Sequence, residues 1–145
     1  MFILDNKNKK LKIIIVSAIS ATILCSIIVL ASLSPISNSG PNVNQFGDIG
    51  MWMSIILILI SYAIPLIIYS LGVDAFKYVM AALCGLGLLI GMAVIFTTIL
   101  FIFTSTTSMI LYALLCLSVL YIMSNIIWIF ITFSTSNKSK NTILQ

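Results

Sequence analysis

The chain has 145 residues, of which 61% are hydrophobic and 7% are charged, and its mean hydropathy is +1.26. A water-soluble domain of this length does not carry so apolar a composition, so the sequence predicts an integral membrane protein. Lysine and aspartate supply all the charge, +4 in total, because glutamate, arginine and histidine are absent. These absences remove most side chains used for acid-base catalysis and metal binding, so we expect no catalytic, cofactor or metal site.

The first apolar stretch covers about residues 12–33 and follows a short polar start. Its apolar part is longer than the central region of a secretory signal peptide, so we expect a retained helix, although the sequence around Ser32 leaves cleavage open. Ser17, Ala21 and Cys25 are spaced four residues apart along it. Such a row of small side chains lets membrane helices approach closely, so we expect it to pack against another helix.

Residues 34–50 form the one sizeable connection, with two prolines, three glycines and three asparagines. This composition shows no helical period and predicts an irregular loop, in which Asp48 is the only charged residue. We expect the segment from Phe46 to Trp52, together with the basic cytoplasmic ends of the chain, to be the parts available for recognition. Met51, Trp52 and Met53 offer soft thioether ligands for Cu(I), but without a neighbouring His or Cys we favour packing at the membrane surface.

The second span covers about residues 51–71 and contains Pro65 and Ser61. Proline has no N–H to donate, and its ring clashes with the carbonyl four residues earlier, here that of Ser61. We therefore predict a kink at Pro65. Ser61 is the intramembrane polar residue that we single out in this span, and we place it on the same helix face as Pro65.

The third span covers about residues 78–103 and is uncharged throughout. At 3.6 residues per turn its small residues share one narrow face, and these residues are Cys84, Gly87, Gly91 and Thr98. Large side chains occupy the opposite face. Lipid tails are as apolar as leucine, so close backbone approach at small residues drives packing. We expect this small-residue face to contact another helix, either in this chain or in a second copy.

The fourth span covers about residues 109–133 and carries polar side chains at helical spacing on one face, namely Ser118, Tyr121, Asn125, Trp128 and Thr132. An amide inside a membrane needs a hydrogen-bond partner because lipid offers none. We favour an interhelical hydrogen bond for Asn125 over a substrate or ion contact. The same polar stripe is also compatible with the lining of a pore, so that alternative stays open.

Positive charge indicates the orientation of the four spans. The turns at 72–77 and 104–108 are short, so the helices that they join are predicted to be antiparallel neighbours. Four lysines lie at the N-terminus, one in the 72–77 turn and two in the tail, and none lies in 34–50 or 104–108. Lysine-rich segments stay in the cytoplasm, which explains the net charge without a nucleic-acid partner.

The predicted fold class is therefore an all-α membrane protein, an up-down four-transmembrane-helix bundle with both termini cytoplasmic. Residues 1–145 would form a single integral membrane domain, with an external loop at 34–50, an external turn at 104–108 and a cytoplasmic tail at 134–145. We expect a multi-pass protein of a bacterial plasma membrane.

The predicted function follows by elimination. No span contains an ionisable carrier of the kind that proton-driven transport uses, and the chain carries no nucleotide motif. We predict a small non-enzymatic membrane protein of accessory, regulatory or immunity type. It would act through helix or loop contact with a membrane protein, a membrane-active peptide or a second copy within the lipid bilayer. The alternative is a small pore-forming, holin-like or transport oligomer.

Overall fold

The computed structural model describes residues 2–40, 43–73, 75–104 and 108–133. Within these ranges it is all-helical, with α1 (Phe2–Leu33), α2 (Ile49–Ser70), α3 (Phe76–Thr104) and α4 (Met109–Phe133), and a short 3-10 helix η1 (Pro35–Asn38). Each of the four α-helices contains a stretch long and apolar enough to cross a membrane. Even the shortest of them, at about 33 Å, exceeds a hydrocarbon core of about 30 Å. The prediction of an all-α chain with four such helices is confirmed for the described residues.

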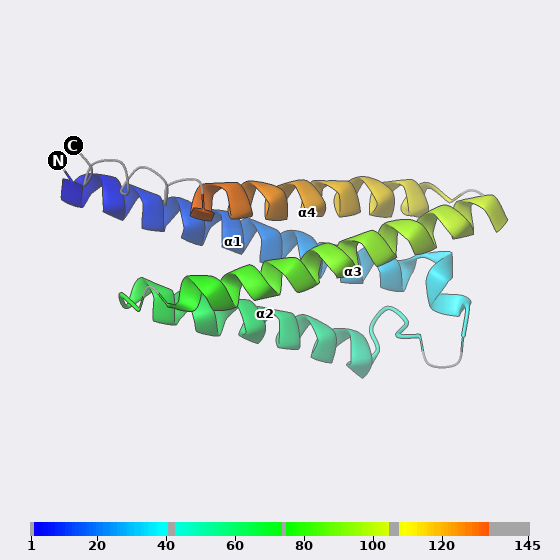
Figure 1. The fold of residues 1–145 in the computed structure, drawn as a ribbon. Helices are drawn as coiled ribbons and strands as arrows, with labels where there is room; N and C mark the ends of the chain where they lie inside the picture. The colour runs from blue at the N-terminus through cyan, green and yellow to red at the C-terminus, as the bar shows by residue number, and fades with distance from the viewer. Residues whose placement is uncertain (1, 41–42, 74, 105–107, 134–145) are drawn as a thin grey trace.

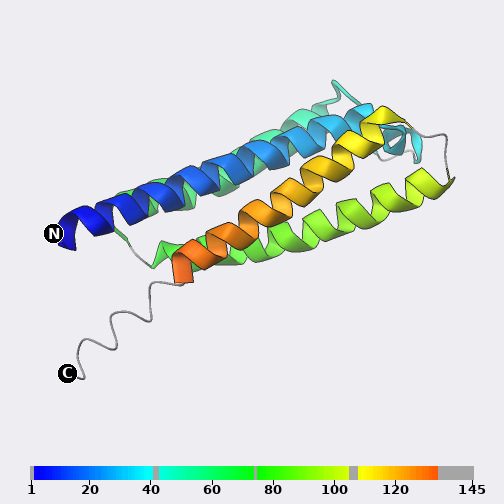
Figure 2. The same ribbon diagram turned by 90° about the horizontal axis from the view of Figure 1, so that it is seen from above.

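The four helices lie side by side (Figure 1), and α4 contacts both α1 and α3, between which it lies in the view of Figure 2. α2 packs against α1 and α3. Trp128, late in α4, bonds to Ser17 in α1, whereas Leu114, early in α4, shares an apolar cluster with Ile27 of α1. This order makes α1 and α4 antiparallel. The up-down arrangement across a membrane and the side on which the termini lie stay predictions.

Local chemistry explains where helices begin and end in the connection between α1 and α2. The Ser34 hydroxyl accepts the backbone N–H of Ile36 at 3.3 Å. Pro35 fits the first helical position, where an N–H would have no partner. The pair therefore starts η1 inside the 34–50 segment, which the sequence predicts to be irregular throughout.

At the other end of α2, Gly72 has a φ of +106°, a left-handed conformation that a Cβ disfavours.

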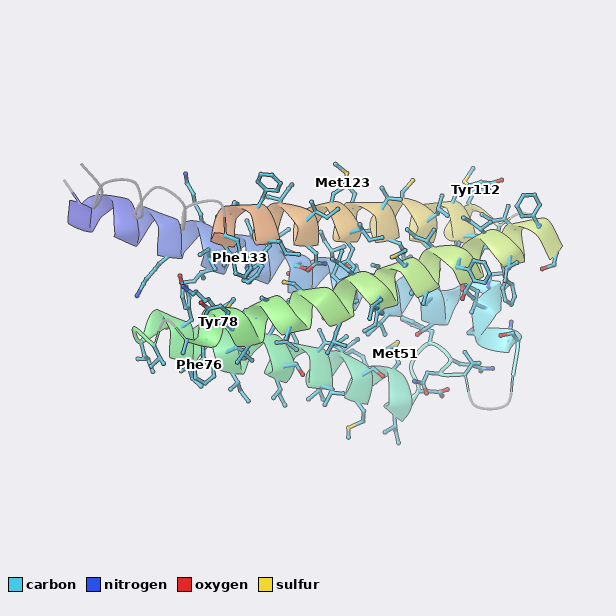
Figure 3. The ribbon with its side chains drawn as sticks, in the orientation of Figure 1. Met51, Phe76, Tyr78, Tyr112, Met123 and Phe133 are labelled. Atoms are coloured by element: carbon cyan, nitrogen blue, oxygen red, sulfur yellow. The ribbon has the colours of Figure 1, made fainter. Side chains whose placement is uncertain are left out.

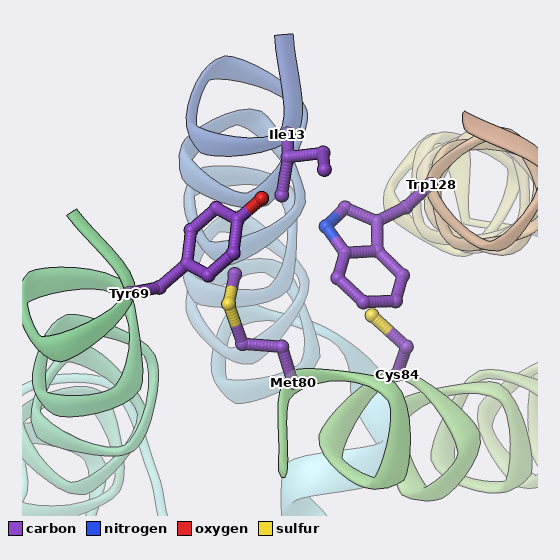
Figure 4. Close-up of a cluster of buried hydrophobic side chains, with 5 residues drawn as sticks. All are labelled: Ile13, Tyr69, Met80, Cys84 and Trp128. Atoms are coloured by element: carbon purple, nitrogen blue, oxygen red, sulfur yellow. The ribbon is translucent and has the colours of Figure 1, made fainter. Parts of the chain in front are cut away.

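The interior contains two apolar clusters to which side chains from several helices contribute. In the first, Trp128 of α4 meets residues of the other three helices, namely Ile13, Tyr69, Met80 and Cys84 (Figure 4). The second cluster consists of Leu24, Ile27, Leu114 and Tyr121. The two clusters tie the helices together at different depths, because Ile13 and Ile27 of α1 are about 21 Å apart along the helix axis.

The outer surface of the bundle is apolar, as a lipid-facing surface should be. Tyr112 and Met123 of α4 point away from the other helices (Figure 3). On α3 the large side chains opposite the small-residue face are exposed, namely Leu86, Leu89, Phe96, Leu100 and Phe103. An apolar exterior of this kind matches a hydrocarbon surrounding.

Charge separates the two ends of the bundle. The start of α1, the end of α2 and the start of α3 lie at one end (Figure 1). There the Lys10 ammonium lies 5.5 Å from the ring centre of Tyr69, and that of Lys77 lies 5.2 Å from the ring centre of Tyr78. Both distances allow cation–π attraction. Asp48 immediately precedes α2 at the opposite end.

α2, α3 and α4 begin and end within two residues of the expected spans at 51–71, 78–103 and 109–133. α1 begins ten residues before the expected span at 12–33. α2 continues through Pro65, which is buried; the kink there stays a prediction. The 134–145 tail and residues 105–107 of the external turn lie outside the described residues.

Candidate functional site

The candidate site is the polar interior of the bundle, and α4 supplies most of it. One face of α4 is buried along its whole length, and its residues are Leu111, Leu114, Ser118, Tyr121, Asn125, Trp128 and Thr132. They recur every three or four positions, which is the spacing of one helical face. The polar stripe read from the sequence is therefore the inward face of α4.

Asn125 links α4 to α1. The Ser20 hydroxyl of α1 donates to the Asn125 side-chain oxygen at 3.2 Å. The Asn125 amide nitrogen donates to the carbonyl of Tyr121, one turn earlier, at 3.0 Å. Ser20 and Asn125 are 1% and 0% exposed. The amide thus has partners on both its oxygen and its nitrogen, as a polar group shielded from water requires.

Trp128 makes the second link between the same helices. Its indole N–H donates to the Ser17 hydroxyl at 2.8 Å. Of the predicted small row on α1, Ser17 and Ala21 are buried and Cys25 is half-buried. The packed face of α1 is therefore rotated from this row toward Ser20, which the sequence reading missed.

Tyr121 connects α4 to α2. Its hydroxyl lies 3.2 Å from that of Tyr62, and either oxygen can be the donor. Ser61, the residue singled out from the sequence, is half-buried and donates to the carbonyl of Leu57 in its own helix at 2.7 Å. Tyr62, Pro65 and Tyr69 follow an i, i+3, i+7 spacing, and this was the signal that could have identified the inward face of α2.

The small-residue face of α3 receives Tyr121. A Cβ added at Gly87 would overlap the Tyr121 hydroxyl oxygen. One added at Gly91 would lie 3.1 Å from Ile122 Cγ1 and 3.2 Å from Tyr121 Cδ1. Both glycines are buried, as are Cys84 and Thr98 on the same face. The Gly87 position therefore leaves room for the phenol that reaches across to α2.

Ser118 and Thr98 are buried without linking helices. The Ser118 hydroxyl donates to the Leu114 carbonyl at 2.8 Å, and the Thr98 hydroxyl donates to the Val94 carbonyl at 2.7 Å. Each bond closes within one helix and leaves no donor to attract a partner from another element. These two residues contribute to the interior by their small volume.

A small cavity lies beside this network, between α1, α2 and α3. Its volume is about 10 Å³, and it is lined by Ser17, Tyr62, Met80, Leu83 and Cys84. A cavity of this size has room for about one water molecule. It does not have the volume of a site for a drug-sized ligand, which is about 300 Å³ or more.

The chemistry available in the interior consists of neutral hydrogen-bonding groups. Hydroxyls, a phenol pair, one amide and one indole meet there, and α4 takes part in three bonds that join it to another helix. Among the described residues no three His, Cys, Asp or Glu side chains gather in a way that could hold a metal ion. The arrangement can hold four helices in register by hydrogen bonds and close packing.

Comparisons with known proteins give a family without an assigned activity. The family described as "Family of unknown function (DUF5391)" matches residues 4–137. "Uncharacterized protein YxaJ" of Bacillus subtilis (strain 168) is 52% identical over 83 residues, or 57% of this chain. The match covers 59% of the length of that relative. No solved structure matches the chain.

Proposed function

The chain belongs to the DUF5391 family, and we propose that it is a bacterial plasma-membrane protein that acts by contact, as an accessory, regulatory or immunity-type protein. Its partner would be another membrane protein, a membrane-active peptide or a second copy of the chain. A membrane location is supported by the four helices, each able to cross a bilayer. A bacterial source is supported by the Bacillus relative.

The observation that carries this proposal is the use of the interior polar groups. Asn125, Trp128 and Tyr121 are each bonded to another helix and are fully buried. A polar group that lines a conducting path must instead be open to water. With its polar interior engaged in holding the helices, the protein has its outer faces and ends available for recognition.

The proposed orientation has an up-down bundle with both termini in the cytoplasm and Asp48 outside. Lys10, Lys12 and Lys77 at one end and Asp48 at the other support it, since lysine-rich ends stay in the cytoplasm. A retained first helix is supported by Ser17 and Ser20, which α1 contributes to the network.

Single-cysteine labelling tests this orientation, in full-length chains whose three native cysteines are replaced. Ser39 and Lys12 are exposed at opposite ends of the bundle. In intact cells a membrane-impermeant maleimide should modify Ser39→Cys, and it should modify Lys12→Cys only after permeabilisation. The reverse pattern would place Asp48 in the cytoplasm and overturn the orientation.

Cross-linking in native membranes, followed by purification of the tagged full-length chain, tests action by contact. We expect a discrete cross-linked species, either with a membrane component or with a second copy. Alanine at an exposed contact residue such as Trp52 should reduce this species, whereas alanine at lipid-facing Ile64 serves as the matched control. Recovery of the monomer alone, under conditions that cross-link a known membrane complex, would contradict the proposal.

A further inference from the structure

We infer that the turn before α2 is a docking site for a cationic amphipathic peptide that reaches the membrane from outside. Phe46, Asp48 and Trp52 would supply its main contacts. This inference rests on the proposed orientation and on action by contact, and it specifies the partner.

The turn is closed by two hydrogen bonds between the same residues. The backbone N–H of Asp48 donates to the Gln45 carbonyl at 3.1 Å, and the backbone N–H of Gln45 donates to the Asp48 carboxylate at 2.9 Å. Gly47, between them, has a φ of +89°, which favours glycine. The Asp48 side chain therefore shapes the turn and does not cap α2, where it makes no hydrogen bond.

The turn is also held against the start of α2. The Asn44 side chain occupies the space in which a Cβ of Gly50 would lie. Met51, the next residue, is 1% exposed and anchors the start of the helix in the bundle. The turn is thus packed against the start of α2, which is itself anchored in the bundle, so ordering the turn would cost a ligand little conformational entropy.

Exposed apolar side chains precede and follow Asp48 in the chain. Trp52 lies one helical turn after Asp48, because its backbone N–H bonds to the Asp48 carbonyl at 3.3 Å. Phe46, Ile49 and Trp52 are 57%, 82% and 56% exposed. An exposed aromatic and aliphatic surface beside one negative charge combines the two features that an apolar cationic ligand needs.

Charge identifies the sign of the ligand. Asp48 is the only charged residue in 34–50 and 104–108, whereas the described lysines lie at the opposite end. A lysine-rich peptide could pair an ammonium with Asp48, place another over the Trp52 ring and bury its leucines against Phe46 and Ile49. An acidic peptide would meet repulsion. Interfacial aromatic side chains can also serve only as lipid anchors, and the experiment distinguishes the two roles.

The test uses the full-length protein in nanodiscs of phosphatidylcholine, a lipid without net charge. The probe is a fluorescent amphipathic peptide of leucine and lysine, and its reference is binding to nanodiscs without protein. We expect binding in excess of the reference, decreasing with salt. A peptide with glutamate in place of lysine should show no excess.

Two substitutions at one position separate charge from turn structure. Asp48→Asn keeps an oxygen for the Gln45 N–H but removes the charge, so it should weaken the excess binding by up to about fivefold, as loss of an exposed ion pair does. Asp48→Lys should weaken it further. Phe46→Ala and Trp52→Ala should also reduce it, whereas Ile64→Ala, exposed elsewhere on α2, should not.

Binding equal to that of empty nanodiscs would overturn the inference, as would unchanged binding by Asp48→Lys. The aromatic residues would then be lipid anchors only. If the Asp48→Lys variant still forms a cross-linked species in native membranes, the protein acts by contact, but with a partner that Asp48 does not bind. Absence of any cross-linked species with the unsubstituted protein would instead count against the proposed function itself.

Discussion

α4 and α2 are similar in length and apolarity but differ in how the bundle uses them. In the apolar stretch of α4, 28% of the residues are buried, whereas in that of α2 the share is 11%. α4 takes part in three cross-helix side-chain hydrogen bonds, and α2 takes part in one of these three, through Tyr62. Hydrophobicity therefore does not distinguish an inner from an outer helix. The placement of small and polar residues distinguishes them, because any face in contact with lipid accommodates large apolar side chains.

The largest effect is expected where Tyr121 of α4 crosses α3. Gly87→Leu should reduce the free energy of unfolding by about 3 kcal/mol, since the added side chain must displace a buried phenol. Gly85→Leu is the matched control, because a Cβ at Gly85 meets nothing within 4 Å. Titration with a denaturing detergent, followed by circular dichroism, measures both. Equal losses would mean that the Gly87 face is not packed against α4.

A smaller effect is expected at the bond between α1 and α4. Asn125→Leu should cost about 0.6 to 2 kcal/mol of unfolding free energy, the range for interhelical hydrogen bonds in membranes. In a double-mutant cycle, Ser20→Ala and Asn125→Leu should be less than additive because they remove the same bond. Ser61→Ala, whose hydroxyl bonds only within α2, is the control. Strict additivity would show that Ser20 and Asn125 do not interact.

The smallest effect is expected in α2. Tyr62→Phe removes one hydroxyl of the Tyr62–Tyr121 pair and should cost about 0.6 kcal/mol in the same unfolding assay. Tyr112→Phe, on the exposed face of α4, should cost nothing measurable. A Tyr62→Phe loss larger than that of Asn125→Leu would reverse the comparison and make α2 an equal partner in the interior.

Sequence patterns predict the interior best where a helix has one small or polar face. The face from Cys84 to Thr98 on α3 and the stripe from Ser118 to Thr132 on α4 are buried as their spacing indicates. On α1, small residues occupy every position from Ser17 to Thr22 except Ile19, so several faces resemble one another and the spacing alone did not reveal Ser20.

The inward face of α2 and the short helix η1 could not be predicted from the sequence, for a different reason. Ser61 is more typical of a helix-packing position than Tyr62, but a serine hydroxyl can bond to its own helix, and only the structure shows that it does. η1 depends on the local pairing of Ser34 with Pro35 in a segment without a hydrophobic period. Orientation comes from the lysines alone, because the contacts between helices are the same whichever end faces the cytoplasm.

Solute flux through liposomes that contain the purified full-length protein would show whether the interior of the bundle conducts or only holds the helices together. We expect release of a small dye and dissipation of an ion gradient to match those of protein-free liposomes, because Tyr121, Asn125 and Trp128 of α4 are bonded to neighbouring helices. Asn125→Leu should leave this baseline unchanged. Flux above the baseline that Asn125→Leu abolishes would overturn action by contact and support a pore lined by the polar face of α4.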